Sequence, residues 1–226
     1  VAEIIRSAQV KAPDMIGIGL GSPGLVDKKG ETILFSPNLP RWRNIPIKRM
    51  VSERFSKPCV LENDANAAAL GEYYFGEETL PEDYIFVTLG TGVGGAAIID
   101  KLVFKGGGGN AMEPGHMPSA NGKVLERNIG KNELLEMANT MRAEYSGKTQ
   151  VPTNGEITTT GLVAAASEGD ELALQIFDRM GSLLGDGLVS MIRILDITTV
   201  LIGGGLSGSF DYIIAAVNRQ LNYWLT

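Results

Sequence analysis

The stretch LENDANAAALGE at residues 61–72 places an ionisable aspartate, Asp64, between an asparagine and a run rich in alanine. Alanine is the strongest helix former, so we expect a helix to begin here, directly after the apolar, strand-like CVL. Asp64 can therefore be the N-cap of this helix, a role worth roughly 1 kcal/mol. It can equally be held there as a general base that takes a proton from a substrate. Both roles need an ionised carboxylate, which the positive end of a helix favours, so the two interpretations are compatible.

A second group with chemical potential is the motif MEPGHM, in which Glu113 stands three residues before His116. His116 is the only histidine of the chain, and a lone histidine is more often structural than functional. Its spacing from Glu113 and its position shortly after a run of glycines favour a functional role, because imidazole changes its charge near neutral pH.

Glycines 90, 92 and 95 fit G-x-G-x-x-G, the dinucleotide fingerprint, which has meaning only where a helix follows the glycines. Here the apolar AAIID follows, with a turn at Asp100 and Lys101 and then LVF, a pattern that predicts a β-hairpin or meander. We therefore reject a Rossmann fold. The glycine turn can still present backbone N–H groups to a phosphate, since glycine reaches the dihedral angles of an anion-binding concavity.

A second glycine turn, residues 203–205, follows the apolar TTVLI and precedes a helix that can begin near Ser207 or Ser209. The preceding residues are expected to form a buried strand. A strand, a glycine turn and a helix N-terminus in succession predict a cradle for a phosphate or a nucleotide.

The remaining sequence indicates the elements that must position these motifs. We expect a helix at the start, then a strand over MIGIGLGSPGLVD broken by a Gly/Pro turn. ILFSPNLPRWRNIP, with three prolines, is typical of a loop, and IKRMVSERF has helical spacing with one apolar face of Ile47, Met50, Val51 and Phe55. ETLPED at residues 78–83 is expected to connect two halves. Residues 157–196 predict helix, with core positions Leu172, Ile176, Met180 and Leu184.

Composition restricts the class of protein. The 226 residues are 44% hydrophobic and 20% charged, as in an ordinary globular protein, and the net charge of −6 argues against a partner made of nucleic acid. Cys59 is the only cysteine, which excludes an internal disulfide or a Cys-rich zinc site and is typical of a buried core thiol. With no apolar run of membrane-spanning length and no signal peptide, we expect a cytoplasmic location.

Taken in order, GSPGLVD, LENDANAAALGE, LGTGVGG, EPGHM and IGGGLS resemble the ROK family of repressors, open reading frames and sugar kinases. The resemblance covers nearly the whole chain. It implies an α/β protein with the two-domain, ribonuclease H-like fold of actin and hexokinase, divided into residues 1–82 and 83–226, with the sugar and ATP in the cleft between the domains. It also implies that the protein is a homodimer.

The resemblance implies a role for each motif. Asp64 matches the general base, which accepts the sugar hydroxyl proton as the γ-phosphoryl group of ATP arrives. The positions that match the sugar-binding residues are Gly24, Asn63, Glu113, His116 and Glu126. Those that match the ATP-binding turns are Gly90, Thr91, Gly92, Gly203, Gly204 and Gly205. A glycine-rich cradle, Mg²⁺ and one oriented carboxylate suffice for phosphoryl transfer. Glu126 by itself would be a surface charge, and only the match of VLERNIG to the family suggests its role.

Two functions follow from the resemblance. The first is a glucokinase-like, ATP-dependent kinase that phosphorylates a hexose or an N-acetylhexosamine. The second is a sugar-sensing transcriptional regulator whose DNA-binding segment lies outside this chain. In either case the segment itself is expected to bind a sugar and to contact neither nucleic acid nor a membrane.

The sequence departs from the family pattern at two places. Many ROK proteins join the G-H histidine to three cysteines in a zinc site, but MPSANGKVL at residues 117–125 has no cysteine, so we predict no structural zinc. The family's first strands, with a D-x-G-G-T element, and its closing strand and helix have no counterpart here. We therefore expect that both domains are incomplete, that the chain is a fragment, and that it is catalytically inactive alone.

Overall fold

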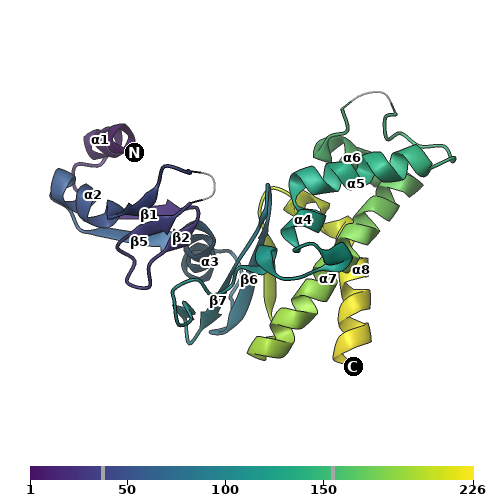
Figure 1. The fold of residues 1–226 in the computed structure, drawn as a ribbon. Helices are drawn as coiled ribbons and strands as arrows, with labels where there is room; N and C mark the ends of the chain where they lie inside the picture. The colour runs from purple at the N-terminus through teal and green to yellow at the C-terminus, as the bar shows by residue number, and fades with distance from the viewer. Residues whose placement is uncertain (37–38, 154–155) are drawn as a thin grey trace. The chain divides into compact units, whose positions relative to one another are not determined.

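The structure is a computed structural model that describes residues 1–36, 39–153 and 156–226 (Figure 1). Two compact units divide these residues. The first comprises Val1–Leu80 and Ala97–Met112, and the second comprises Pro81–Ala96 and Glu113–Thr226. Residues 97–112 therefore belong to the first unit by their contacts, although they lie far along the chain.

The first unit contains a parallel strand pair, β1 (Ile18–Ser22) and β5 (Cys59–Asn63), whose register runs from Ile18 opposite Cys59 to Ser22 opposite Asn63. Helices α1 (Ala2–Lys11) and α2 (Ile47–Phe55) contribute to its core, which contains Ile5, Ile18, Val51 and Cys59. The prediction of a buried thiol at Cys59 is confirmed, and burial raises the pKa of that thiol, against a smaller opposing effect of Lys48. The prediction that Met50 belongs to the apolar face of α2 was wrong. This residue is 52% exposed.

A small antiparallel sheet completes this unit, in the order β2 (Leu25–Val26), β3 (Ile33–Phe35) and β4 (Arg43–Ile45). The prediction of a loop for ILFSPNLPRWRNIP was therefore wrong at both ends. Pro40 and Pro46 lie outside the strands, so they remove no hydrogen bond from the ladder. Burial of Ile33 with Val26 and Leu61 stabilises the pairing of β2 with β3, which the local composition does not predict.

A four-stranded sheet has the order β8-β7-β6-β9, formed by β8 (Leu102–Val103), β7 (Val93–Ile99), β6 (Tyr84–Leu89) and β9 (Val200–Gly203). A strand, not a helix, follows the glycines at 90–92, which confirms the rejection of a Rossmann fold. Asp100 and Lys101 form the predicted turn, both with positive φ. Strands β6 and β9 are parallel, with Thr88 opposite Gly203.

Helices make up most of the second unit. They are α4 (Glu126–Ile129), α5 (Lys131–Glu144), α6 (Thr159–Ser167), α7 (Glu171–Leu195) and α8 (Phe210–Leu225), with 3₁₀ turns η1 (Pro114–His116), η2 (Ala120–Gly122) and η3 (Ser207–Ser209). Helices α7 and α8 pack along each other (Figure 1). The four predicted core positions of α7 are buried. Among the described helices, none has both the length and the apolar character needed to cross a membrane.

Candidate functional site

The start of helix α3 (Asp64–Phe75), which follows β5 without a loop, carries the candidate base. Asn63 is the N-cap, because its Oδ1 accepts hydrogen bonds from the backbone N–H of Ala65 at 2.8 Å and of Asn66 at 3.2 Å. The interpretation of Asp64 as the cap was therefore wrong by one residue. Asp64 is the first helical residue, and its exposed carboxylate accepts through Oδ1 from Ala65 N–H at 3.0 Å. Because Asn63 supplies the cap, the helix does not depend on Asp64 for capping, and the Asp64 side chain stays exposed.

The side-chain amide of Asn63 joins this helix start to the turn between β1 and β2. Its Nδ2 donates to the carbonyl of Gly24 at 3.2 Å, so the structure brings Gly24 and Asn63 together. Gly24 has φ +90°, and a Cβ there would overlap the Phe35 carbonyl, so this turn requires glycine. Oδ1 of Asn63 accepts both capping hydrogen bonds, and Nδ2 carries a second N–H besides the one that it donates to Gly24.

Glu62, two residues before Asp64, forms a charged contact that the sequence motifs did not predict. The Glu62 carboxylate forms an ion pair with Lys105, with Oε2 and Nζ 2.6 Å apart. Its other oxygen accepts from the backbone N–H of Asn63 at 3.1 Å and from Nδ2 of Asn66 at 3.0 Å. Glu62 stands in the LENDAN motif, but no local pattern points to Lys105, since its partner is distant in sequence.

In the second unit, the two glycine turns are adjacent. They follow the parallel strands β6 and β9, and the backbone N–H of Leu206 donates to the Leu89 carbonyl at 3.0 Å. Gly204 has φ +96°, and a Cβ there would overlap the same carbonyl. Residues 90–92 and 203–205, predicted to bind ATP, therefore share one sheet edge at the carboxyl ends of the strands, where α/β sheets commonly bind ligands.

Glu126, the first residue of α4, contacts the turn at Gly90–Gly92. Its Oε2 accepts from the backbone N–H of Val93 at 3.2 Å, and a Cβ on Gly92 would overlap this oxygen. The turn is also fixed to the start of α5, because the Lys131 N–H donates to the Gly90 carbonyl at 3.0 Å. The structure therefore brings a residue predicted to bind sugar against a turn predicted to bind phosphate.

The motif that contains Glu113 and His116 forms the 3₁₀ turn η1, which packs on strand β7. A Cβ on Gly115 would overlap the Val93 carbonyl and would lie 3.3 Å from Cβ of Glu126. The side chains of Glu113 and His116 are 37% and 64% exposed, and Oε2 and Nδ1 are 3.9 Å apart, a separation too long for a hydrogen bond. Gly115, which lies between Glu113 and His116 in the sequence, therefore packs against both Val93 and Glu126.

Residues 117–125 close on themselves through backbone contacts. Pro118 and Val124 form a β-bridge, and the Leu125 N–H donates to the Met117 carbonyl at 2.9 Å. Across the described parts of the chain, no three His, Cys, Asp or Glu side chains are grouped so that they could hold a metal ion. These hydrogen bonds define the loop that follows His116.

Comparisons with known proteins agree over the whole chain. The model of the ROK family matches residues 1–226. The xylose repressor of Caldicellulosiruptor bescii is 30% identical over 97% of this chain, and the glucokinase of Streptomyces coelicolor is 31% identical over 100% of it. The chain spans 59% of the repressor's length and 75% of the glucokinase's.

Solved structures include a ROK family glucokinase from Streptomyces griseus in complex with glucose and AMPPNP. It superimposes with a TM-score of 0.80 and 30% identity, and the match covers 99% of this chain and 77% of that one. The predicted fold of the actin and hexokinase type is thereby confirmed.

Proposed function

The chain belongs to the ROK family, and on this premise we propose that the protein is an ATP-dependent sugar kinase, with a hexose or an N-acetylhexosamine as its substrate. The observation that carries this proposal is the start of α3, where Asn63 supplies the cap and leaves the exposed Asp64 carboxylate available. The similarity to glucokinases supports the same conclusion.

Asp64 acts as the general base in this proposal. A sugar hydroxyl oxygen attacks the γ-phosphorus of ATP, its proton passes to the Asp64 carboxylate, and the bond from the γ-phosphorus to the bridging oxygen breaks to release ADP. Phosphoryl transfer depends on positioning and charge stabilisation more than on covalent chemistry, so one oriented carboxylate is sufficient. A base of this kind contributes roughly 10²- to 10⁴-fold to the rate.

In this proposal the sugar is bound by the residues that match the sugar-binding positions of the family. Asn63 offers one N–H, and Glu113, His116 and the second carboxylate oxygen of Glu126 offer acceptors and donors that match the hydroxyls of a sugar. Gly24 contributes by its backbone, as the resemblance implies. Because discrimination between sugars depends on single hydrogen bonds, the choice of hydroxyl pattern is set by these side chains.

ATP is bound by the turns at residues 90–92 and 203–205, whose glycines allow close approach of the backbone to phosphates. Mg²⁺ takes most of its ligands from the phosphates and water and needs only one or two carboxylates, so a closed cage of protein ligands is not required. When bound, it neutralises charge on the transferred group. The complex of the Streptomyces griseus glucokinase with AMPPNP supports ATP as the phosphoryl donor.

A second candidate function is a sugar-sensing transcriptional regulator. The 30% identity to the xylose repressor of Caldicellulosiruptor bescii favours it, since the same sugar-binding residues can serve a sensor without catalysis. In this alternative Asp64 would bind the sugar and transfer no proton. A homodimer and a cytoplasmic location remain predictions for either function.

A coupled assay of ADP release decides between the two functions. The full-length protein is incubated with ATP, Mg²⁺ and, one at a time, glucose, fructose, mannose, N-acetylglucosamine, N-acetylmannosamine and xylose. We expect turnover with one of the first five sugars. Sugar-dependent thermal stabilisation without turnover would overturn the kinase proposal and favour the regulator.

The variant Asp64→Asn tests the role of the base. We expect it to lower kcat by roughly 10²- to 10⁴-fold while the Kd for the sugar stays near the wild-type value. Asp14→Asn is the matched control, because it removes an exposed carboxylate of the same unit outside the candidate site. Wild-type turnover by Asp64→Asn would refute the assignment.

A further inference from the structure

The ion pair between Lys105 and Glu62 fixes the strand end that precedes Asp64. We propose that Lys105 is a positioning residue for the phosphoryl transfer: acting through Glu62, it holds the first turn of α3 so that the Asp64 carboxylate faces the sugar hydroxyl. This inference rests on the proposed kinase function. It concerns a residue that lies outside all of the motifs discussed for the site.

Glu62 connects the ion pair to both flanks of Asp64. One carboxylate oxygen contacts the Lys105 ammonium, while the other accepts from the backbone N–H of Asn63 and from the side chain of Asn66. Asn63 in turn caps the helix at Ala65 and Asn66. Asn63, directly before Asp64, and Asn66, two residues after it, are therefore both bound to the Glu62 carboxylate. This restricts the direction of the Asp64 side chain.

The environment makes this contact strong enough to orient the backbone. The Lys105 and Glu62 side chains are 24% and 16% exposed, so the pair is screened by water less than a surface ion pair. Asn66 is also buried. Loss of the ammonium would leave a largely buried carboxylate without its cation, and such a group rearranges or draws in water.

The segment that carries Lys105 is itself fixed within the first unit. The Phe104 N–H donates to the Ala97 carbonyl at 2.8 Å. A Cβ on Gly30 would lie 2.7 Å from the Leu61 carbonyl and 3.9 Å from Lys105 Nζ, so the turn at Gly30 closes tightly over β5 and the ammonium. The position of Lys105 beside Glu62 is thus imposed by its surroundings.

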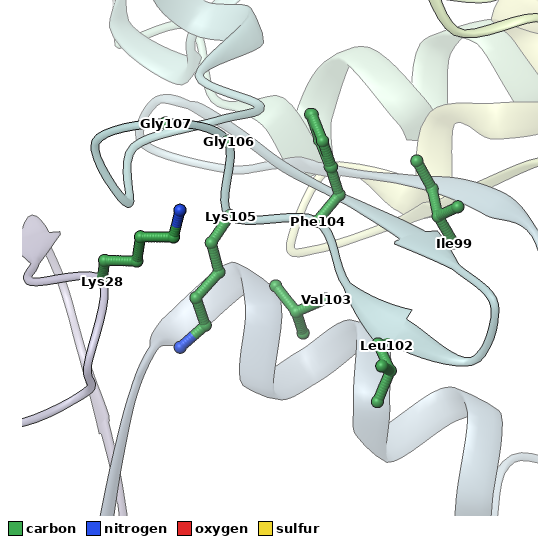
Figure 2. Close-up of a pocket in the computed structure, with 8 residues that line it drawn as sticks. All are labelled: Lys28, Ile99, Leu102, Val103, Phe104, Lys105, Gly106 and Gly107. Carbon is green, nitrogen blue, oxygen red and sulfur yellow. The ribbon is translucent and has the colours of Figure 1, made fainter.

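A neighbouring lysine provides a matched control. Lys28 and Lys105 both line a pocket of about 680 Å³ with the apolar side chains of Ile99, Leu102, Val103 and Phe104. Figure 2 shows that the two lysines reach the pocket from different segments and point their amino groups in different directions. Lys28 is exposed, so Lys28→Met removes the same charge from the same pocket without touching Glu62.

The experiment compares Lys105→Met, Lys105→Arg and Lys28→Met in the full-length protein. Hydrogen exchange is measured at the amides of Asn63, Ala65 and Asn66, whose N–H groups the network binds, and kcat and KM are measured with the sugar that the wild type phosphorylates. For Lys105→Met we expect faster exchange at these amides and unchanged exchange in α7. We also expect kcat to fall by roughly 10- to 100-fold, because small displacements of a reacting group have effects of this size.

The remaining outcomes distinguish positioning from general stability. The KM for the sugar should change by less than about threefold, Lys105→Arg should recover most of kcat, and Lys28→Met should match the wild type. Wild-type exchange or wild-type kcat in Lys105→Met would overturn the inference while the kinase function stands. If the wild type phosphorylates no sugar, the proposed function fails, and the exchange rates alone decide whether Lys105 orders the start of α3.

Discussion

The Glu126 carboxylate lies directly against Gly92. Its Oε2 accepts the backbone N–H of Val93 at 3.2 Å, and no side chain fits at residue 92 without displacing this oxygen. One hydrogen bond therefore joins the start of α4 to the turn between β6 and β7. The two positions came from separate motifs, and their contact gives the glycine a steric reason in addition to phosphate binding.

Gly92→Ala should displace the Glu126 carboxylate and break its bond to Val93. We expect a loss of about 0.5–1.5 kcal/mol in the free energy of unfolding, measured by chemical denaturation, because the displaced group is the flexible end of a side chain. Sugar affinity, measured by calorimetry, should also fall. In the background Glu126→Ala the obstacle is gone, so the same glycine substitution should cost little, and additive effects of the two changes would refute this contact.

Asn63 has two structural roles that substitutions can separate. Asn63→Ala should cost about 0.5–2 kcal/mol in unfolding free energy, because the helix loses its cap. Asn63→Ser keeps a capping oxygen and should cost less, but it removes the amide that donates to Gly24 and that we propose contacts the sugar. We therefore expect both variants to weaken sugar binding equally in a thermal shift titration, whereas equal loss of stability would contradict the capping role.

Asp170 links the loop at residues 149–150 to the start of α7. Burial by itself would raise the pKa of its carboxyl, but hydrogen bonds from Ala173 N–H, Gln150 N–H and Thr149 Oγ1 outweigh it and lower the pKa. A lowered pKa stabilises the fold above the unfolded value of roughly 3.9, and this stabilisation is lost as the pH falls through the folded value.

Asp170→Asn should therefore destabilise the protein by about 1–3 kcal/mol at pH 7 and by less at pH 3, which lies below the unfolded pKa of the carboxyl. Urea denaturation at both pH values measures the difference. Thr158→Ala is the control, since Thr158 caps α6 by accepting from Gly161 N–H without an ionisable group, so its cost should not depend on pH. A pH-independent loss in Asp170→Asn would contradict the hydrogen-bonded carboxylate.

Gly181 allows α7 and α8 to approach closely. A Cβ at this position would lie 2.9 Å from Cβ of Ala216 and closer still to the Ile213 carbonyl. Gly181→Ala should lower the melting temperature, because overpacking costs about 1–3 kcal/mol and exceeds the gain in helix propensity. Gly71→Ala in α3, where a Cβ meets nothing within 4 Å, should raise it.

The chemistry of the candidate site could be predicted from short motifs because each motif is a local device. An asparagine and an aspartate before an alanine-rich helix, or a glycine turn after an apolar strand, keep their geometry whatever packs around them. The core face of α7 could be predicted for the same reason, since Leu172, Ile176 and Met180 follow the period of a helix. Local patterns predict less well which of two neighbouring residues takes a role. At the start of α3, Asn63 supplies the cap that Asp64 could also have supplied.

Contacts between distant residues were decided only by the tertiary structure. The parallel pairing of β6 with β9 joins two glycine turns that are more than a hundred residues apart, and the packing of Gly115 on Val93 brings η1 beside Glu126. The pairing of Lys105 with Glu62 depends on a segment that returns to the first unit. Such contacts arise because burial and strand pairing favour them over the entropy of loop closure, a balance that no local pattern of residues contains.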